Sequence, residues 1–379
     1  MARVVVLGVG RVGSAIAWDL HQAGHEVVMV DRDAGVLQQA GAHLSATSIV
    51  CDVAIDLEGL RKAISPADLI VCAVPGHVGF ATVREIIAAG KHCVDISFAP
   101  ENILDLDPFA RARGVTVIAD MGVAPGMSNW LLGYHGARMR VARFHCYVGG
   151  LPKVRTLPFQ YKAPFSPRDV IEEYCRPARL RENGVTQNRP ALSDLELIEI
   201  PGVGTLEAFN TDGLRSLLTS FPDVPDLKEK TLRYPGHATL IAALQKAGFF
   251  AAKPLTVAGY DIAPIEFTSK ILFNDWQLAA TDPEFTVMRI SIEGEEADSH
   301  VVYEYLLYDE RDPQTQISSM ARTTGFACTA ACDLFISGKW RSVGVFPPEK
   351  IAEKQDCHDH VLQYLAARNI KFTVDRKSL

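Results

Sequence analysis

Three glycines near the start of the chain, in the run GVGRVG, have the spacing of a dinucleotide-binding loop. Gly8 permits a tight turn, Gly10 lets the backbone approach a pyrophosphate, and Gly13 permits close packing of the helix that follows. The first turn of that helix, with Arg11 and Val12, supplies backbone N–H groups and the positive end of the helix dipole. The spacing therefore predicts cofactor contacts at all five residues.

An acidic residue lies where the ribose of such a cofactor is expected. Asp31 follows Gly13 by 18 positions and ends the apolar run HEVVMVD. A carboxylate at this position accepts both ribose hydroxyls of NAD and repels the 2′-phosphate of NADP. Arg32, beside it, could accept that phosphate or stack on adenine, so the pattern favours NAD and leaves NADP open.

Further candidate residues follow the later apolar runs of the first 122 residues. Ligands of an open parallel sheet bind beyond the carboxyl ends of its strands. We therefore expect cofactor contacts at Asp52, Val53, Ala73, Val74, Pro75 and Ser97. For Asp52 and Ser97, helix capping or turn formation is an equally good interpretation.

These residues need a sheet that gathers them along one edge. Six short apolar runs alternate with amphipathic segments, in the order RVVVL, HEVVMVD, SATSIVCDV, ADLIVCAVPG, KHCVDIS and VTVIAD. Strands that alternate with helices predict an α/β fold, here a Rossmann doubly wound parallel sheet over residues 1–122.

The pattern changes from about residue 140 to strands with turn punctuation. Strands are predicted at ARFHCYVGG, LELIEIP, TLEAFN, KTLRYPG, APIEFTSKILF, FTVMRISIEG and HVVYEYLLYDE. With helices at DVIEEYCR and ATLIAALQKAG, this predicts a second α+β domain with a mainly antiparallel sheet over residues 123–320. A second subunit would cover one face of that sheet, so we expect a homodimer through this domain. Residues 321–379 are expected to return to the Rossmann domain.

Composition excludes several classes of protein. A chain of 379 residues exceeds the size of a single core, so two domains are expected. The net charge of −7, without a Lys/Arg block, disfavours a nucleic-acid partner, and no apolar run approaches the length of a membrane span. Without a secretory pattern at the start, we expect a cytoplasmic protein. The eight cysteines form no CxxC pair, so neither disulfides nor a metal site is predicted.

Seven motifs together resemble the saccharopine dehydrogenase superfamily, and more closely its lysine 6-dehydrogenase-like branch. They are GVGRVG, DISF, GVAPGMSN, VGGLP, YKAPFSPRDVIEEY, FNTDGL and LRYPGH, and they span nearly the whole chain. Saccharopine reductases commonly have an acidic residue before the Pro-Gly pair and a Cys before GGLP. Ala124 and Val148 stand there in this chain, which counts against saccharopine as the substrate.

The resemblance implies an NAD-dependent oxidoreductase that oxidises the ε-amino carbon of L-lysine to the semialdehyde with loss of ammonia. A secondary-amine-forming reductase of the saccharopine type, using NADP(H), is the alternative within enzymes. A binding protein that senses dinucleotides without catalysis is the alternative of another class.

This chemistry requires a base, groups that orient it, and a clamp for the α-amino acid end of the substrate. We expect Lys162 or Asp95 as the base, with Tyr161 and Asp120 as orienting partners. Arg168 is expected to hold the carboxylate and Asp212 the ammonium, with Asn210, Arg233 and His237 as second contacts. A surface residue of a first helical turn is the alternative for Arg168, a turn residue for Asp212, and a helix cap for His237. Residues 148–167 are accordingly interpreted as a substrate-side wall rather than a linker.

Overall fold

The computed structural model describes residues 1–42, 44–165 and 167–378, with the side chains of residues 167 and 168 outside that description. The chain divides into two compact units. Unit 1 comprises residues 1–140, 215–220 and 320–371, and unit 2 comprises residues 141–214, 221–319 and 372–379. Unit 1 thus continues beyond the expected boundary at residue 122, and the last residues of the chain lie in unit 2.

Unit 1 is built on a seven-stranded parallel sheet in the order β17-β6-β5-β4-β1-β2-β3. Its strands are β1 (Arg3–Leu7), β2 (Glu26–Asp31), β3 (Thr47–Val50), β4 (Leu69–Cys72), β5 (Cys93–Asp95), β6 (Thr116–Ile118) and β17 (Gly344–Phe346). The central strands are short runs of apolar residues buried on both faces, as parallel strands between helices must be. The six predicted strands have the Rossmann order, which confirms the predicted fold class for this half.

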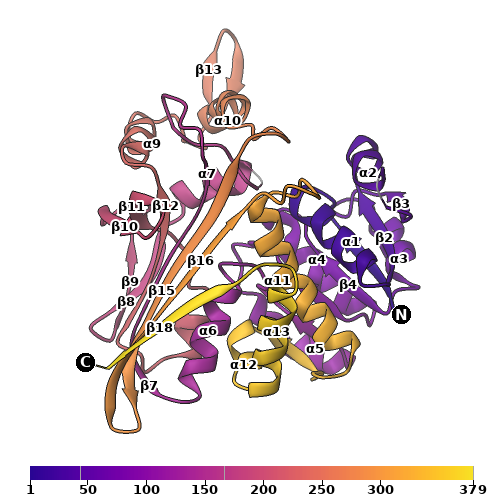
Figure 1. Ribbon diagram of the computed structural model, residues 1–379. Coiled ribbons are helices and arrows are strands. Elements are labelled where there is room, and N and C mark those ends of the chain that lie inside the picture. Colours follow the sequence, from indigo (N-terminus) through magenta and orange to yellow (C-terminus); the bar gives the residue numbers. More distant parts are fainter. Residues whose placement is uncertain (43, 166, 379) are drawn as a thin grey trace. The chain divides into compact units, whose positions relative to one another are not determined.

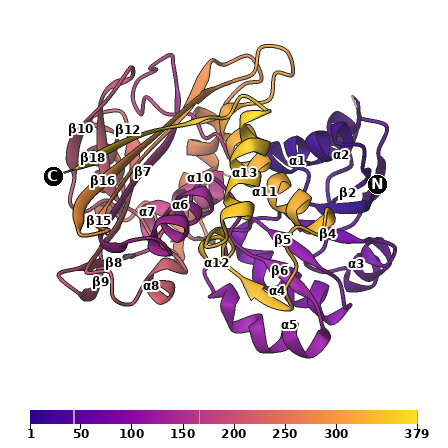
Figure 2. The same ribbon diagram turned by 60° about the horizontal axis from the view of Figure 1, so that its bottom comes forward.

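Helices cover both faces of this sheet (Figure 2). The helices of unit 1 are α1 (Arg11–Gln22), α2 (Ala34–Gly41), α3 (Leu57–Ile64), α4 (Gly76–Ala88), the 3₁₀ turn η1 (Ile103–Leu106), α5 (Asp107–Arg113), α6 (Met127–Gly136), α8 (Leu217–Ser220), α11 (Ser319–Ile336), α12 (Pro348–Ala352) and α13 (Gln355–Ala366). Asp19 of α1 accepts hydrogen bonds from Thr329 of α11 and from Tyr364 and Arg368 at α13, at 2.5 to 2.7 Å. This buried carboxylate ties the C-terminal helices to the first helix of the chain.

Unit 2 contains a mainly antiparallel nine-stranded sheet in the order β10-β11-β12-β7-β15-β16-β18, with β8 and β9 joined at β12. Its strands are β7 (Arg140–Pro152), β8 (Ala178–Glu182), β9 (Val185–Arg189), β10 (Glu196–Ile200), β11 (Gly204–Asn210), β12 (Asp226–Arg233), β15 (Glu284–Glu296), β16 (Ser299–Glu310) and β18 (Phe372–Ser378). Figure 1 shows β15 and β16 as a long pair with β18 beside them. The predicted antiparallel character is confirmed.

Three helices and a small hairpin complete unit 2: α7 (Pro167–Cys175), α9 (His237–Lys246), α10 (Pro264–Asp275), β13 (Leu255–Val257) and β14 (Tyr260–Ile262). The prediction of a strand at APIEFTSKILF is wrong, because this segment forms α10. Pro264 begins the helix, where its missing N–H costs nothing. Thr268 and Leu272, four residues apart, are its buried residues, which is a helical and not a strand period.

None of the helices among the described residues is long and apolar enough to cross a membrane.

Candidate active site

The glycine loop of unit 1 joins β1 to α1. Gly8 has a φ of +83°, and a Cβ there would lie 2.6 Å from the carbonyl oxygen of Ala73. A Cβ at Gly13 would lie 1.9 Å from the carbonyl oxygen of Gly8, whereas one at Gly10 would meet nothing within 4 Å. Gly8 and Gly13 are therefore required by packing, and the open space at Gly10 leaves its backbone accessible to a phosphate group.

Asp31 ends β2 beside this loop. Its Oδ2 accepts the Val9 N–H at 2.7 Å and its Oδ1 accepts the Asp33 N–H at 3.0 Å. Each carboxylate oxygen has a second lone pair, so Asp31 can still accept ribose hydroxyls while the backbone holds it in place. The side chain of Arg32 is exposed next to it.

The other predicted cofactor contacts also follow strands of unit 1. Asp52 follows β3, and its Oδ1 accepts the Ala54 N–H at 3.0 Å, so it also forms the turn that was the alternative interpretation. Ala73, Val74 and Pro75 connect β4 to α4 beside the glycine loop, where the Ala73 N–H donates to the Leu7 carbonyl at 2.8 Å. Val53 follows Asp52 and is half-buried.

Asp95 ends β5 and is almost fully buried, at 1% exposure. Its Oδ1 accepts the Ser97 hydroxyl at 2.7 Å and the Ser97 N–H at 3.2 Å. Burial raises the pKa of Asp95 to about 7, although the hydrogen bonds from Ser97 and the Cys72 thiol oppose this shift and the nearby Asp120 reinforces it. A carboxyl group in this state exchanges protons near neutral pH.

Asp120, just beyond β6, forms a buried ion pair that the sequence did not reveal. Arg215 donates from Nε and Nη2 to the two carboxylate oxygens, both at 3.3 Å, and from Nη1 to the Ala99 carbonyl. Its guanidinium also lies over the Phe98 ring, 5.2 Å from the centroid. The short segment 215–220 thereby fixes Asp120 from a distant part of the sequence.

In unit 2, Tyr161, Arg233 and His237 come together around buried aromatic rings. The Arg233 guanidinium lies 4.4 Å from the centroid of the Tyr161 ring and donates to the Tyr161 hydroxyl at 3.4 Å. Its Nε donates to the Tyr174 hydroxyl at 3.1 Å. The Tyr174 hydroxyl in turn lies 2.9 Å from Nε2 of His237.

The hydrogen bonds around His237 define its state. Nδ1 lies 2.9 Å from the Phe159 carbonyl, which can only accept, so Nδ1 carries the proton and Nε2 accepts from Tyr174. Burial, and then the charge of Arg233, lower the pKa of His237 to about 3. His237 is therefore a neutral link in a chain of hydrogen bonds that runs from Arg233 through Tyr174 to the backbone.

Glu173 supplies the counter-charge of this cluster. Its Oε2 accepts from Nη2 of Arg233 at 3.3 Å, and its side chain keeps 19% exposure. Burial raises the pKa of Glu173 to about 7, although Arg233 opposes the shift. Unit 2 thus holds a second carboxyl group that titrates near neutrality.

Lys162 and Trp276 lie beside the cluster of Tyr161, Arg233 and His237. Lys162 donates from Nζ to the Asp275 carbonyl at 2.5 Å, and the Ala163 N–H donates to the Trp276 carbonyl at 2.8 Å. The Trp276 ring packs edge-on to Tyr161 with centroids 5.3 Å apart, and its buried Nε1 has no acceptor among the described residues. A ligand oxygen is one acceptor that would satisfy this donor.

The remaining predicted substrate contacts have protein partners or lie outside the described part. Arg179 grips Asp212 from Nε and Nη2, both at 2.9 Å, and Asn210 donates to Ser193 and Asp194. The side chain of Arg168 lies outside the described residues. Within the described residues, no group of three or more His, Cys, Asp or Glu side chains is arranged to hold a metal ion.

Two family models cover almost the whole chain. Residues 4–118 match the saccharopine dehydrogenase NADP binding domain, and residues 122–370 match the saccharopine dehydrogenase C-terminal domain. The chain belongs to the saccharopine dehydrogenase family. This confirms the resemblance to the saccharopine dehydrogenase superfamily that the motifs indicated, and the matched first domain makes the cofactor a nicotinamide dinucleotide.

Individual relatives of this saccharopine dehydrogenase family member are distant. The NADP(+)-dependent, L-glutamate-forming saccharopine dehydrogenase of Pyricularia oryzae is 25% identical over 71% of this chain and 62% of its own length. A carboxyaminopropylagmatine dehydrogenase of Synechocystis sp. is 21% identical, over 93% of each chain. The chain spans less than two thirds of the length of three curated relatives that it matches.

A solved structure has the same fold. The apo saccharopine dehydrogenase (L-Glu forming) of Saccharomyces cerevisiae superposes with a TM-score of 0.80 over 100% of both chains, at 18% identity.

Four residues of this family member that the sequence did not single out take part in the candidate site. Glu173 and Tyr174 lie in the motif YKAPFSPRDVIEEY, where the buried Val170, Ile171 and Tyr174 mark one face of α7. That spacing could have identified Tyr174 as inward-facing. Arg215 and Trp276 carried no signal, because their partners lie about 100 residues away along the chain.

Proposed function

We propose that this chain is an NAD-dependent dehydrogenase that acts on the CH–NH₂ group of an amino acid, most simply an L-lysine 6-dehydrogenase. The observation that carries the proposal is Asp95, a buried carboxyl group with a pKa of about 7 that lies in the same unit as the glycine loop. Asp95 is the last residue of β5, and the glycine loop follows the carboxyl end of β1, two positions away in the sheet. Cofactor and base would thus share one edge of one sheet.

The chemistry has two steps. In the first, a base takes a proton from the substrate ammonium and releases it to solvent, while a bound nicotinamide dinucleotide would accept the hydride from the carbon bearing the nitrogen, which would leave an iminium ion. In the second, water adds to the iminium carbon, the base takes a proton from that water, and ammonia leaves with the aldehyde. A base with a pKa near 7 is suited to both proton transfers at neutral pH.

Asp95 is our first choice for that base, and its hydrogen bond to Ser97 orients it. Lys162 is the second choice, since Nζ already donates to the Asp275 carbonyl. Asp120, held by Arg215, is proposed to tune Asp95 through its charge. In unit 2, Tyr161, Arg233 and His237 stay proposed contacts of the substrate.

Arg168 stays our proposed clamp for the substrate carboxylate. Asp212 and Asn210 are weaker candidates for the α-amino end, because Arg179 already occupies both carboxylate oxygens of Asp212 and Asn210 donates to Ser193 and Asp194.

The test is a spectrophotometric assay of the purified protein with L-lysine, L-ornithine and related diamines, each with NAD and with NADP. NADH formation with L-lysine, together with ammonia release, is expected. Absence of turnover with every amine would refute the proposal, and NADH binding without turnover would identify a dinucleotide-sensing protein instead. The variant Lys162→Met then separates the two bases: nearly normal turnover is expected if Asp95 is the base, and a loss of about 10²-fold if Lys162 is.

A second candidate function is formation of a secondary amine from an amino compound and an aldehyde or keto acid, with NADPH as reductant. It is supported by relatives whose names describe saccharopine and carboxyaminopropylagmatine dehydrogenases. NADPH consumption that requires both reaction partners would establish it. Oxidation of L-lysine alone would argue against it.

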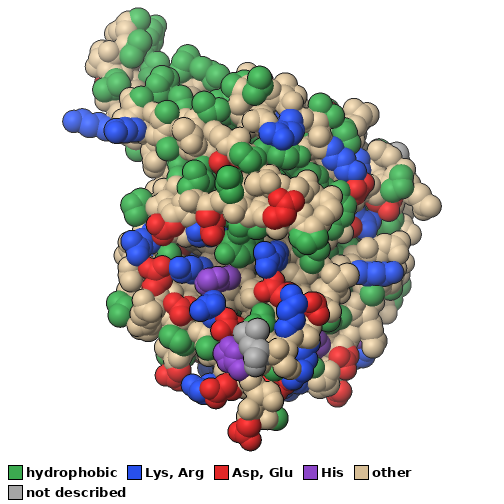
Figure 3. Space-filling view, turned by 60° about the vertical axis from the view of Figure 1, so that its left-hand side comes forward, with side chains coloured by type: hydrophobic (Ala, Val, Ile, Leu, Met, Phe, Trp, Pro, Cys, Tyr) green, Lys and Arg blue, Asp and Glu red, His purple; other side chains and the backbone are tan. Residues whose placement is uncertain are grey.

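We also propose that unit 2 forms a homodimer through an exposed apolar surface on α9, α10 and the β13–β14 hairpin. Figure 3 shows hydrophobic side chains gathered at the top of the molecule, where these elements lie. The apolar surface consists of Leu240, Phe249, Leu255, Val257, Tyr260, Ile262, Phe267 and Ile271, which are 38% to 73% exposed. Contiguous apolar surface of this kind is typical of a protein interface.

Sedimentation analysis of the variant Phe267→Asp tests this interface. The variant is expected to be monomeric, whereas Val185→Asp, at an apolar residue on β9 with 59% exposure, is expected to leave a dimer intact. A wild-type protein that sediments as a monomer would refute the proposal.

A further inference from the structure

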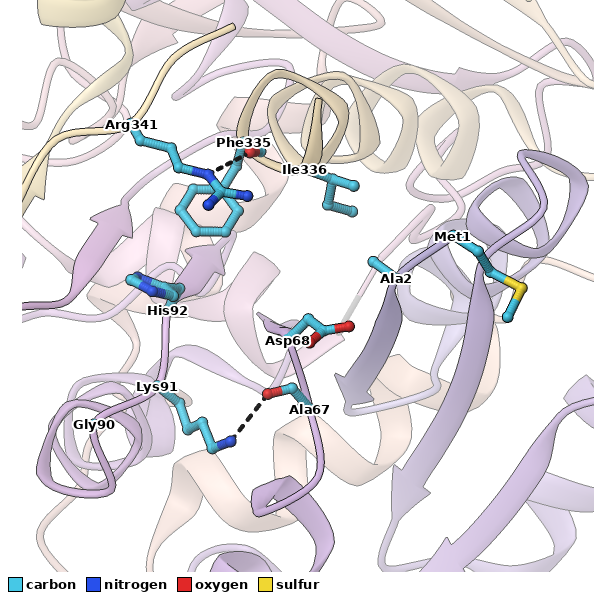
Figure 4. A pocket seen from close by; sticks show the side chains of 10 residues that line it. All are labelled: Met1, Ala2, Ala67, Asp68, Gly90, Lys91, His92, Phe335, Ile336 and Arg341. Atoms are coloured by element: carbon cyan, nitrogen blue, oxygen red, sulfur yellow. Dashed lines mark hydrogen bonds between the residues drawn. The ribbon is translucent and has the colours of Figure 1, made fainter. Parts of the chain in front are cut away.

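Unit 1 has an open pocket of about 550 Å³ at the amino-terminal ends of β1, β4 and β5 (Figure 4). These three strands are neighbours in the sheet, and the pocket is lined by residues directly before each of them and by the end of α11. The glycine loop and Asp95 lie beyond the carboxyl ends of the same strands. A four-residue strand spans about 13 Å, so the pocket is separate from the candidate dinucleotide site.

One side of the pocket presents hydrogen-bond donors in a fixed arrangement. Phe335 is the centre of this side: the Arg341 guanidinium lies 4.5 Å from its ring centroid, and the His92 ring lies 4.8 Å from it. Arg341 donates from Nε to the Phe335 carbonyl at 2.9 Å, which leaves its terminal N–H groups with no partner among the described residues. Such a planar pair of donors matches a carboxylate.

His92 contributes another donor on the same side. Its Nδ1 accepts the Thr116 N–H at 2.9 Å, so in the neutral ring Nε2 carries the proton. Burial, and then the charges of Arg341 and Lys91, lower the pKa of His92, which keeps the ring neutral at neutral pH. Nε2 has no acceptor among the described residues.

A carboxylate and a second cation complete the polar lining. Asp68 accepts the Arg3 N–H through Oδ2 at 2.8 Å, which leaves Oδ1 open toward the pocket among the described residues. Lys91 uses two of its three N–H groups on the carbonyls of Ser65 and Ala67. The side chains of the lining thus carry two positive charges, on Lys91 and Arg341, and one negative charge, on Asp68.

The opposite side of the pocket has apolar side chains. Figure 4 shows Ala2 across the opening from Arg341 and His92, with Asp68 between the two sides and Ile336 above, while the exposed side chain of Met1 points away. A ligand that satisfies all of these groups has a carboxylate, an ammonium group next to it and an apolar tail.

We propose that this pocket binds a free α-amino acid with an aliphatic side chain, as a second ligand site of the chain. Arg341 and His92 would take the carboxylate, Asp68 the ammonium, and Ala2 and Ile336 the side chain. The proposal is independent of which reaction the chain catalyses, because no residue of the pocket belongs to the candidate active site.

Three probes of matched length test the ligand chemistry by isothermal titration calorimetry on the full chain. L-norleucine carries both charged groups, hexanoate lacks the ammonium, and pentylamine lacks the carboxylate. L-norleucine is expected to bind at least about tenfold more tightly than either of the others, since it alone makes charge-assisted hydrogen bonds to both Arg341 and Asp68. Equal binding of hexanoate, or no binding of L-norleucine, would overturn the proposal.

Variants then locate the site. Arg341→Gln and Asp68→Asn keep polar side chains and are each expected to weaken L-norleucine at least about tenfold. Arg113→Gln is the matched control, since this exposed arginine of the same unit also lies over an aromatic ring, 5.6 Å from the centroid of Phe109. L-norleucine binding that survives Arg341→Gln would place the ligand elsewhere and refute the proposed site. Retained thermal stability of both variants verifies that they are folded.

Discussion

The two units hold their functional polar groups in different ways. In unit 1, backbone amides help to hold two carboxylates of the candidate site, although Arg215 holds a third, Asp120: Asp31 accepts from Val9 and Asp33, and Asp95 from the Ser97 N–H as well as its hydroxyl. In unit 2, side chains hold one another, with Arg233 at the centre of the hydrogen-bonded cluster. The backbone of a parallel sheet positions polar groups by its fold, whereas the antiparallel sheet of unit 2 relies on partners from several segments.

This difference has an energetic consequence. Where one carboxylate oxygen accepts the bonds, as Oδ1 of Asp95 does, an amide can remove the charge and keep the hydrogen bonds, because its oxygen accepts from the same donors. A cation inside a side-chain cluster cannot be removed without leaving buried partners unsatisfied. We therefore expect substitutions in unit 1 to change ligand binding and chemistry, and those in the unit 2 cluster to change folding first.

The largest effect is expected from Arg233→Met. Removing the cation leaves Glu173 and the hydroxyl groups of Tyr161 and Tyr174 without their donor in a buried cluster. Breaking one partner out of a buried ion pair costs about 3–5 kcal/mol, so the variant should unfold at a much lower denaturant concentration. Chemical denaturation followed by circular dichroism measures this.

Arg189→Met is the control within the same unit. Its pair with Glu182 is partly exposed, at 38% for the arginine side chain, and exposed pairs contribute little to stability because water and salt screen them. If Arg233→Met and Arg189→Met lowered the free energy of unfolding equally, the proposal that the buried partners of Arg233 depend on it would be wrong.

The next largest effect is expected from Asp95→Asn in unit 1. If Asp95 is the base, turnover should fall by about 10²-fold or more while dinucleotide affinity stays unchanged, because the amide keeps the hydrogen bonds but takes up no proton. In the wild type, kcat/KM should rise with pH as Asp95 loses its proton near pH 7. Steady-state kinetics across pH measures both.

Asp105→Asn, at an exposed carboxylate of the same unit, is the matched control and should leave turnover unchanged. A similar loss in both variants, or normal turnover of Asp95→Asn, would remove Asp95 from the mechanism.

Much of the fold was predictable because its signals are local. The alternation of apolar runs and amphipathic segments predicted six strands, and the known order of a doubly wound sheet did the rest. Strand β17 is only three residues long and pairs with β6, which lies more than 200 residues away in the sequence, so local sequence patterns could not predict it. The prediction of a strand at α10 gave more weight to the β-branched and aromatic residues of the segment than to Pro264, which is a typical first residue of a helix.

The candidate site divides in the same way. Gly8 is needed for a tight turn, Gly13 for close packing of helix on loop, and Asp31 stands at the end of a strand. A short stretch of sequence is enough to indicate each of these. The partners of Arg233 come from residues 59 to 72 positions away, and that of Asp120 from 95 positions away. Burial and pairing of that kind arise only from the tertiary fold.

Stability should depend on pH in opposite directions through Asp95 of unit 1 and His237 of unit 2, which gives a third test of the difference between the units. The pKa of Asp95 is raised from 3.8 to about 7, so its contribution to stability is fully present below pH 3.8 and is lost as the pH rises through 7. The pKa of His237 is lowered from 6.5 to about 3, so its contribution is present above pH 6.5 and is lost as the pH falls towards 3. Each slope is expected to be about 1 kcal/mol per pH unit.

Calorimetric melting between pH 4 and pH 8 separates the two groups. Relative to the wild type, Asp95→Asn should gain stability as the pH rises from 4 to 7, and His237→Gln should gain it as the pH falls below 6.5. Curves that run parallel to the wild type in both variants would show that neither group titrates as its burial indicates.

The smallest effect is expected at Asp31, where only the choice of cofactor should change. Asparagine has one acceptor oxygen where Asp31 uses two, so in Asp31→Asn that oxygen can keep the Val9 N–H while the exposed Asp33 N–H is left to water, and the melting temperature should fall only slightly. Loss of the negative charge removes the repulsion of a 2′-phosphate, and the exposed Arg32 beside it can then pair with that phosphate. The ratio of kcat/KM for NADP to that for NAD should therefore rise about tenfold, equivalent to about 1.4 kcal/mol.

The double variant Asp31→Asn with Arg32→Ala should reverse most of that gain, because the cation of Arg32 is what attracts the phosphate. An unchanged ratio in Asp31→Asn would mean that the carboxylate serves the loop alone, and that the cofactor of this chain is selected elsewhere in unit 1.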